Sequence, residues 1–481
     1  MVDVDLLTLS GLELAAVIRR REASPTEVTA LVLDRAERLD ADLGLFVTRT
    51  AQMALDQARE AERLLATAPD PRDLPPLLGV PCPIKDLTRV AGVRWTLGSA
   101  AFADQVADVD DGVVTLLRHA GTVMTGTTTT PELGLPCYTE PDVAPPARTP
   151  WDPRRSAGGS SGGAAAVVAA GVAPLALGSD GGGSIRIPAS CCGVVGLKPT
   201  RGRVSPGPWG VDVAGLAVHG PLARTVADAA ALLDVLARPW PGDVAQLPAP
   251  RPTFLDAARR PPPRRRVGLL LDPVIAADAP VHPACRQAAR DTADLLADLG
   301  HDVVDVGSPF PAEQWDAFAV VWAALAASVP VPDDRVDRLR PLTTWLRQRG
   351  RAAGAVEYLT ASAEMQRVAR DLAQAWNDVD LVLSPTLAGL PAPVGALRDD
   401  ADPAADFAAQ TRFTPWTSVW NLTGRPAISL PLGWHFEDGT LPVGVMLGAG
   451  FGAEEELLAV AAQLEQARPW RERQEDLIRS L

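Results

Sequence analysis

Apolar and polar residues follow a helical spacing near the start of the 481-residue chain. Ser24, Pro25 and Glu27 form the pattern of an N-cap, a first-turn proline and a capping-box acid. Apolar residues then recur at near-helical intervals, at positions 28, 31, 32 and 39. The pattern predicts a helix that begins after Ser24.

Short apolar runs alternate with helical patterns over much of the remaining chain. The run LLGVPCPIKD predicts a buried strand that ends at Lys85. Further strands are predicted at 264–272, 301–306, 380–384, 426–432 and 441–447. Helices are predicted at 225–237, 283–299 and 355–378. Strands that alternate with helices favour a layered α/β fold.

Three segments depart from this alternation. The stretch 131–163 is rich in proline, glycine and threonine, and it predicts a loop before an alanine-rich helix that begins near Ala164. The proline-rich stretch 239–263 predicts a surface connection between two halves of the chain. The region 311–378, which contains Trp315, Trp322 and Trp345, predicts a mostly helical cap over one side of the sheet.

Composition narrows the class of protein. Apolar residues make up 47% of the chain and aromatic residues 5%, so alanine, valine and leucine must supply most of the core. A net charge of −14 disfavours nucleic acid and anionic membrane surfaces as partners. We find neither a signal-peptide pattern nor an apolar run long enough to span a bilayer, so we expect a cytoplasmic protein without membrane contact.

Cysteine and histidine show no metal-binding arrangement. The five cysteines and five histidines lack the paired spacing of a zinc site. We therefore expect no structural metal, no cofactor and a reducing environment.

Lysine is rare in this chain. Of the 45 basic residues only Lys85 and Lys198 are lysines. Codon bias towards arginine explains the scarcity, but arginine cannot be deprotonated and so cannot replace lysine as a base. Each of the two lysines is therefore a candidate for a chemical role, with packing as the alternative.

Two glycine clusters flank the alanine-rich helix, at 158–163 and 181–183, and Ser184 follows the second. Glycine runs leave backbone N–H groups uncovered, so a serine among them has the parts for acyl transfer. A phosphate-binding loop would need a lysine that neither cluster supplies. The residues Gly158 to Gly162 also match G-x-S-x-G, the motif of α/β-hydrolases. That alternative needs a later acid and a histidine, from among His219, His282, His301 and His435.

The motifs GGSSGG, GSDGGGSIRIPA and GLKPTRGRV occur in this order between 158 and 204, and together they resemble the amidase signature family. The segments GVPCPIKD, TPELG and LPVGVMLG extend the resemblance to about residues 20–240 and 380–467. It implies a single domain over 1–481 with a layered α/β/α fold, a central mixed β-sheet and the region 311–378 as a substrate cap.

The resemblance also implies roles for residues. Its nucleophile falls on Ser184, its bridging serine, which follows a cis peptide bond, on Ser160, and its base on Lys85. Lys198 falls on a structural position. The oxyanion pocket corresponds to the N–H groups of Gly181, Gly182, Gly183 and Ser184. Ser161, Asp180 and Arg186 are expected to fix the loops, and Gly134, Leu135 and Pro136 to contact substrate.

The same resemblance implies the reaction. A small-molecule amide, carbamate or ester would be cleaved through an acyl-enzyme on Ser184, and one stretch resembles members that act on nylon-type amides and urethanes. We expect Lys85 to be buried, because burial lowers the pKa of an amine towards neutrality. Gly181, where many members have a larger residue, is expected to loosen the loop or widen the pocket. A partner-dependent component of an amidotransferase is the rival, and we expect a monomer or homodimer.

Overall fold

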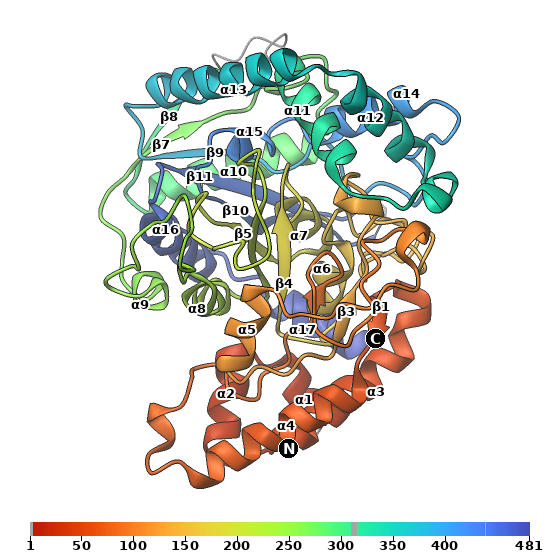
Figure 1. Ribbon diagram of the computed structural model, residues 1–481. Helices are drawn as coiled ribbons and strands as arrows, with labels where there is room; N and C mark the ends of the chain where they lie inside the picture. Colours follow the sequence, from red (N-terminus) through yellow and green to blue (C-terminus); the bar gives the residue numbers. More distant parts are fainter. Residues whose placement is uncertain (1–2, 309–314, 438) are drawn as a thin grey trace.

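A computed structural model describes residues 3–308, 315–437 and 439–481 (Figure 1). An 11-stranded sheet runs through it in the order β1-β3-β2-β4-β6-β5-β10-β11-β9-β7-β8. The strands are β1 (Phe46–Arg49), β2 (Ile84–Lys85), β3 (Gly126–Thr128), β4 (Leu175–Asp180), β5 (Val195–Lys198), β6 (Val218–Ala223), β7 (Arg266–Leu269), β8 (Asp302–Asp305), β9 (Leu381–Pro385), β10 (Ala427–His435) and β11 (Leu441–Ala449). Parallel pairs join β3, β2 and β4 as well as β9, β7 and β8, and the other pairs are antiparallel, so the predicted mixed sheet is confirmed.

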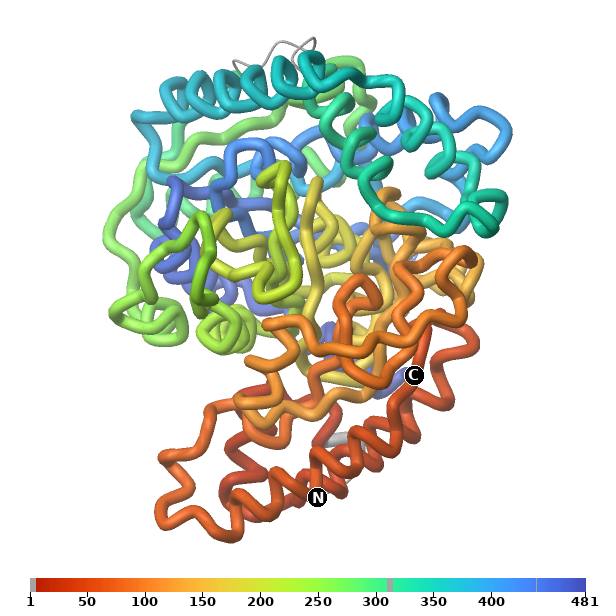
Figure 2. Tube along the Cα trace, viewed as in Figure 1, coloured from red at the N-terminus to blue at the C-terminus, as the bar shows by residue number. Residues whose placement is uncertain are grey.

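Helices surround the sheet, and Figure 2 shows both chain ends at the same side of the molecule. The helices are α1 (Asp3–Thr8), α2 (Gly11–Arg19), α3 (Pro25–Leu43), α4 (Ala51–Thr67), α5 (Gly112–His119), α6 (Gly162–Ala169), α7 (Arg186–Cys192), α8 (Val226–Leu236), α9 (Phe254–Ala258), α10 (Pro283–Asp298), α11 (Trp315–Ser328), α12 (Pro341–Ala352), α13 (Ala355–Ala375), α14 (Pro403–Phe413), α15 (Val419–Leu422), α16 (Glu454–Ala467) and α17 (Arg471–Ser480). No helix of the described residues is long and apolar enough to cross a bilayer.

The central strand β4 shows why the fold has three layers. Side chains alternate between the two faces of a strand. Leu175 and Leu177 lie in the core cluster that includes α8 and α16, whereas Ala176 lies in the cluster that includes α3 and α6. Helices therefore cover both faces of the sheet, as the layered α/β/α prediction requires.

Local sequence signals place several elements correctly. The Ser24 side chain accepts a hydrogen bond from the N–H of Glu27, and the Glu27 carboxylate accepts one from the N–H of Ser24, which completes the predicted capping box of α3. Every strand predicted between 264 and 447 forms, as β7 to β11. The predicted strand that ends at Lys85 shrinks to β2, because the prolines at 81 and 83 have no N–H group for a ladder.

Two segments of the structure differ in detail from the sequence predictions. The stretch 239–263 is mostly exposed loop, but α9 interrupts it and buries Phe254 in the core. The Asp234 carboxylate accepts hydrogen bonds from the N–H groups of Phe254 and Leu255, which holds α9 in place. The helical region is confirmed from residue 315, where α11 begins, while its predicted first residues 311–314 lie outside the described chain.

Candidate active site

Three segments bring the candidate residues to one edge of the sheet. Lys85 is the last residue of β2, and Ser160 lies two residues before α6. Ser184 lies in the tight connection from β4 to α7. Because β2 and β4 are parallel neighbours, with Ile84 opposite Leu177, both end at the same edge.

Lys85 is fully buried and contacts two serines. Its Nζ donates hydrogen bonds to Ser160 Oγ at 2.7 Å and to Ser179 Oγ at 3.1 Å. It also lies 3.3 Å from the carbonyl oxygen of Ser179. The sequence analysis did not single out Ser179, although it lies directly before Asp180 in the motif GSDGGGS.

The environment of Lys85 favours the neutral amine. Burial lowers the pKa of Lys85 to about 7, and the negative charge of Asp180 offsets part of that shift. A pKa near 7 leaves about half of the Lys85 amine uncharged at neutral pH, whereas an exposed lysine with a pKa of about 10.4 is only about 0.04% uncharged. The expectation that Lys85 is desolvated is confirmed.

Ser160 and Ser161 connect the two glycine loops. The peptide bond between Gly159 and Ser160 is cis, as the resemblance implied. The N–H of Ser161 donates to the carbonyl oxygen of Ser184 at 3.0 Å, and its Oγ donates to the carbonyl oxygen of Ser179 at 3.1 Å. Ser161 thus ties the start of α6 to the loop that carries Ser184.

Asp180 and Arg186 form a buried ion pair at the base of this loop. Arg186 donates from two nitrogens to the two Asp180 oxygens, each at 2.9 Å, and both side chains are fully buried. Arg186 also donates to the carbonyl oxygen of Thr417 and to Asn421 Oδ1, each at 2.7 Å. Burial alone would raise the pKa of Asp180, but the charge and hydrogen bonds of Arg186 hold that pKa well below its usual range.

The predicted oxyanion donors divide into two groups. The N–H of Gly183 donates to Asp180 Oδ1 at 2.7 Å, so Gly183 does not fit its predicted role as a donor to substrate. No hydrogen bond within the described chain uses the N–H groups of Gly181, Gly182 or Ser184. These three remain available to a substrate oxygen.

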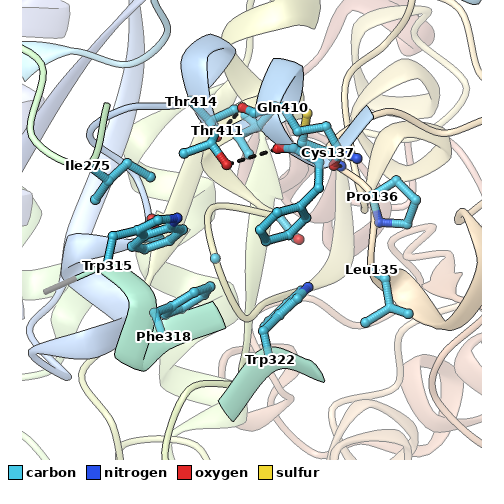
Figure 3. A pocket seen from close by; sticks show the side chains of 15 residues that line it. Leu135, Pro136, Cys137, Ile275, Trp315, Phe318, Trp322, Gln410, Thr411 and Thr414 are labelled. Carbon is cyan, nitrogen blue, oxygen red and sulfur yellow. Dashed lines mark hydrogen bonds between the residues drawn. The ribbon is translucent and has the colours of Figure 1, made fainter. Parts of the chain in front are cut away.

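A pocket opens beside Ser184 (Figure 3). Leu135 and Pro136 line it, whereas Gly134 is not among the residues that line it. Gly134 instead lies close to Ser160, since an added Cβ would be 3.3 Å from Ser160 Oγ. The lining residues are Leu135, Pro136, Cys137, Gly182, Ser184, Ile187, Ile275, Trp315, Phe318, Trp322, Phe407, Gln410, Thr411, Thr414 and Ser418. The sequence analysis identified the two tryptophans as part of the cap region but missed Phe318 and Phe407, whose apolar patterns equally suit a core position.

Comparisons with known proteins agree with this geometry. The sequence pattern of the family described as Amidase matches residues 27–458. The chain belongs to the amidase family. This amidase is accordingly a hydrolase that acts on C–N bonds of amides.

Individual relatives cover nearly the whole chain. The amidase is 35% identical over 491 residues to a 6-aminohexanoate-cyclic-dimer hydrolase of Paenarthrobacter ureafaciens, covering 96% of each protein. It is 34% identical to one component of a glutamyl-tRNA(Gln) amidotransferase of Salinispora tropica, over 96% of this chain and 97% of that one. A solved structure of 6-aminohexanoate cyclic dimer hydrolase with substrate superposes with a TM-score of 0.89 at 32% identity, covering 98% of this chain and 99% of the other.

The α/β-hydrolase alternative requires a histidine beside Ser160, and the amidase has none among its described contacts. His219 contacts Thr88, and His301 contacts Gln463. The rings of His282 and His435 pack against each other with centroids 5.4 Å apart. Lys85 occupies the position next to Ser160 instead.

The second lysine has different surroundings. Lys198 is also buried, and burial together with the charge of Arg186 lowers its pKa to about 7. Its Nζ donates to the carbonyl oxygen of Pro199 at 2.8 Å and to no serine hydroxyl in the described chain. Burial therefore lowers the pKa of both lysines. Of the two, only Lys85 contacts Ser160, the candidate proton relay.

The space beside Gly181 is occupied. An added Cβ on Gly181 would lie 3.4 Å from two ring atoms of Trp322. The Trp322 indole therefore packs against the loop at Gly181. A looser loop or a wider pocket at this position stays a prediction. The five cysteines are buried and unpaired, and Cys191 and Cys192 pack in apolar clusters.

Proposed function

We propose that this amidase cleaves amides through an acyl-enzyme on Ser184, with Ser160 as proton relay and neutral Lys85 as base. One observation carries the proposal: a fully buried amine lies 2.7 Å from the Ser160 hydroxyl. A serine hydroxyl is a weak nucleophile until a base removes its proton. An uncharged amine at hydrogen-bond distance can accept that proton through Ser160.

In the proposed acylation, a proton passes from Ser184 through Ser160 to Lys85, and the amine of the substrate departs. Ser184 Oγ attacks the carbonyl carbon while its proton passes to Ser160, and the Ser160 proton passes to Lys85. The N–H groups of Gly181, Gly182 and Ser184 stabilise the oxyanion. When the C–N bond breaks, Ser160 returns a proton to the departing amine and recovers one from Lys85.

Deacylation repeats these steps with water. Water attacks the ester carbonyl of the acyl-enzyme, and its proton follows the same path to Lys85. The proton then returns to Ser184 Oγ as the carboxylic acid leaves. Carbamates and esters pass through similar tetrahedral intermediates, so we propose them as further substrates beside small-molecule amides such as the one named for the 6-aminohexanoate-cyclic-dimer relative.

The base assignment is tested with Lys85→Arg and Lys85→Met, assayed on an acyl para-nitroanilide. Loss of general-base catalysis should lower kcat by about 10²–10⁴-fold in both variants. Lys198→Met is the matched control, since it removes the other buried lysine. Thermal unfolding of each variant separates lost catalysis from lost folding. Near-wild-type turnover by Lys85→Arg would refute the assignment.

The nucleophile is tested with a sulfonyl fluoride that modifies activated serines. We expect mass spectrometry to find the adduct on Ser184 in the wild type and no adduct in Ser184→Ala. An adduct on Ser160, or hydrolysis that survives in Ser184→Ala, would contradict the proposal.

A partner-dependent amidotransferase component is the second candidate, and the similarity to the Salinispora tropica protein supports it. It differs in one measurable respect: the purified chain alone would not hydrolyse aryl amides. Turnover by the isolated protein therefore favours the independent amidase.

We also propose that residues 1–481 form one domain with a cap in 311–378, because one sheet joins strands from Phe46 to Ala449. A single cooperative unfolding transition is expected. The expected oligomeric state, monomer or homodimer, stays a prediction that sedimentation velocity would test. Cytoplasmic location also stays a prediction.

A further inference from the structure

Helix α11 presents a ladder of three aromatic rings to the active-site pocket (Figure 3). Trp315, Phe318 and Trp322 are spaced by three and four residues, so they share one face of the helix. The rings of Trp315 and Phe318 stack with centroids 4.2 Å apart, and those of Phe318 and Trp322 lie 5.4 Å apart. The interplanar angles are 12° and 17°, so the three rings are nearly parallel.

The inner end of this ladder lies against the loop that would hold the oxyanion. A Cβ on Gly181 would meet the Trp322 ring at 3.4 Å, and one on Gly182 would meet the Phe318 ring at 3.8 Å. The ladder therefore starts beside the N–H groups proposed to bind the substrate carbonyl.

The outer end of the ladder faces a second cavity of about 490 Å³. The two cavities are neighbours, because four residues line both of them, namely Ile275, Trp315, Phe407 and Thr411. Trp345 and Leu346 of α12 add further apolar wall. A volume of this size accommodates a substantial organic group.

The two cavities differ in the charged side chains that line them. None of the described residues that line the inner pocket has a charged side chain. Four charged side chains line the outer cavity, namely Asp278, Asp316, Arg349 and Arg412. Arg412 pairs with Asp278 at 2.7 Å, and the Arg349 guanidinium lies over the Trp345 ring. An ionised group on the inner part of a substrate would lose hydration without gaining a partner, which is costly.

The proton path indicates which part of the substrate lies on the ladder. Ser160 must protonate the departing amine, so the amine lies on the Ser160 side of the carbonyl. An acyl substituent on the opposite side of the carbonyl would lie towards Gly181 and Gly182, against which the ladder packs.

We propose that the ladder and the neighbouring outer cavity form a binding site for a long aliphatic or aromatic acyl group, whose apolar part lies on the ladder. This inference rests on the proposed acyl-enzyme at Ser184. It predicts that the amidase prefers amides of extended apolar acids over amides of short acids.

The preference is measured with para-nitroanilides of acetic and hexanoic acid. We expect kcat/KM for the hexanoyl compound to exceed that for the acetyl compound by at least tenfold. Equal rates for the two compounds would overturn the proposal.

The site is tested with Trp315→Leu and Trp315→Ala. We expect each to lower the ratio of hexanoyl to acetyl kcat/KM, by about tenfold for the alanine variant. Trp209→Ala is the matched control, because Trp209 is 55% exposed and lines neither cavity. An unchanged ratio in folded Trp315→Ala, checked by thermal unfolding, would contradict the assignment.

Substrates with different leaving groups show whether the ladder binds the acyl group or the amine. With para-nitrophenyl esters of the same acids, Trp315→Ala should lower the hexanoyl-to-acetyl ratio as it does with anilides. If the effect follows the length of the amine in acetyl N-alkyl amides instead, the acyl assignment is wrong. Failure of the acyl-enzyme itself is recognised independently, by hydrolysis of acetyl para-nitroanilide that persists in Ser184→Ala.

Discussion

At the scale of single residues, the contact partner decides what a buried lysine does. Lys85 and Lys198 are both buried, and each has a pKa near 7. Lys198 donates to a backbone carbonyl, which has no proton to give. Lys85 donates to a hydroxyl whose proton it can accept in the neutral state. The low pKa lets the Lys85 amine be uncharged near neutral pH, and the contact with Ser160 gives it a hydroxyl from which it can accept a proton.

The pKa of Lys85 predicts how activity depends on pH. The protonated amine cannot accept a proton, so kcat/KM should fall as pH decreases below about 7 and level off above it. A stopped assay with an anilide substrate from pH 5 to pH 9 measures this profile. Lys198→Met should keep the same midpoint. A profile without an inflection between these values would contradict titration of Lys85.

At the scale of elements, the connection from β4 to α7 is held in shape by Asp180. Its carboxylate accepts the N–H groups of Gly183 and Ile185, and Arg186 neutralises its charge. These two N–H groups are thus occupied by Asp180, while those of Gly181, Gly182 and Ser184 donate to no group within the described chain. The loop needs glycine at 183, where φ is +132°.

Gly183→Ala and Gly182→Ala form a matched pair that tests this loop. A Cβ on Gly183 would lie 2.5 Å from Thr417 Oγ1, while one on Gly182 would have no neighbour closer than 3.8 Å. We expect Gly183→Ala to lower the free energy of unfolding by about 1–3 kcal/mol, because a strained conformation and a steric conflict combine. Gly182→Ala should change stability much less. Equal unfolding midpoints for the two variants would contradict the strain argument.

At the scale of the whole molecule, a buried arginine joins segments from both ends of the chain. Arg35 of α3 donates to the carbonyl oxygen of Ala170, at the C-terminal end of α6, and to that of Ile478 in α17, each at 2.7 Å. Its positive charge suits the C-terminal end of a helix. The N-terminal end of α6 lies two residues after Ser160, so Arg35 holds the far end of the helix that follows the candidate active-site serine.

Arg35→Ala should lower the free energy of unfolding by about 2–4 kcal/mol, since it leaves two buried carbonyl groups without their donors. Arg38→Ala on the same helix is the control: Arg38 is exposed and pairs only with exposed Asp34 among the described residues, so the expected change is within about 0.5 kcal/mol. Chemical denaturation monitored by tryptophan fluorescence compares the two. Similar losses in both variants would contradict the proposed role of Arg35.

The sequence by itself determined the features that depend on neighbouring residues. The capping box before α3 is complete within four residues, and hydrophobic periodicity is a local property, so helices and most strands could be located. Ser160, Ser184 and Lys85 could be selected as candidate catalytic residues, because their short motifs and the scarcity of lysine can be read directly from the sequence. The mixed layered fold followed from the same motifs through the family resemblance.

Only the tertiary structure decided what depends on residues far apart in the chain. The two-residue strand β2 is held by β3 and β4, and no local pattern fixes so short a strand. The inward turn of the Gly183 N–H, the contact of Ser179 with Lys85 and the Trp322 ring beside Gly181 arise from packing between separate segments. A sequence records which groups are present, but hydrogen bonds and steric contacts are short-ranged in space, so folding selects their partners.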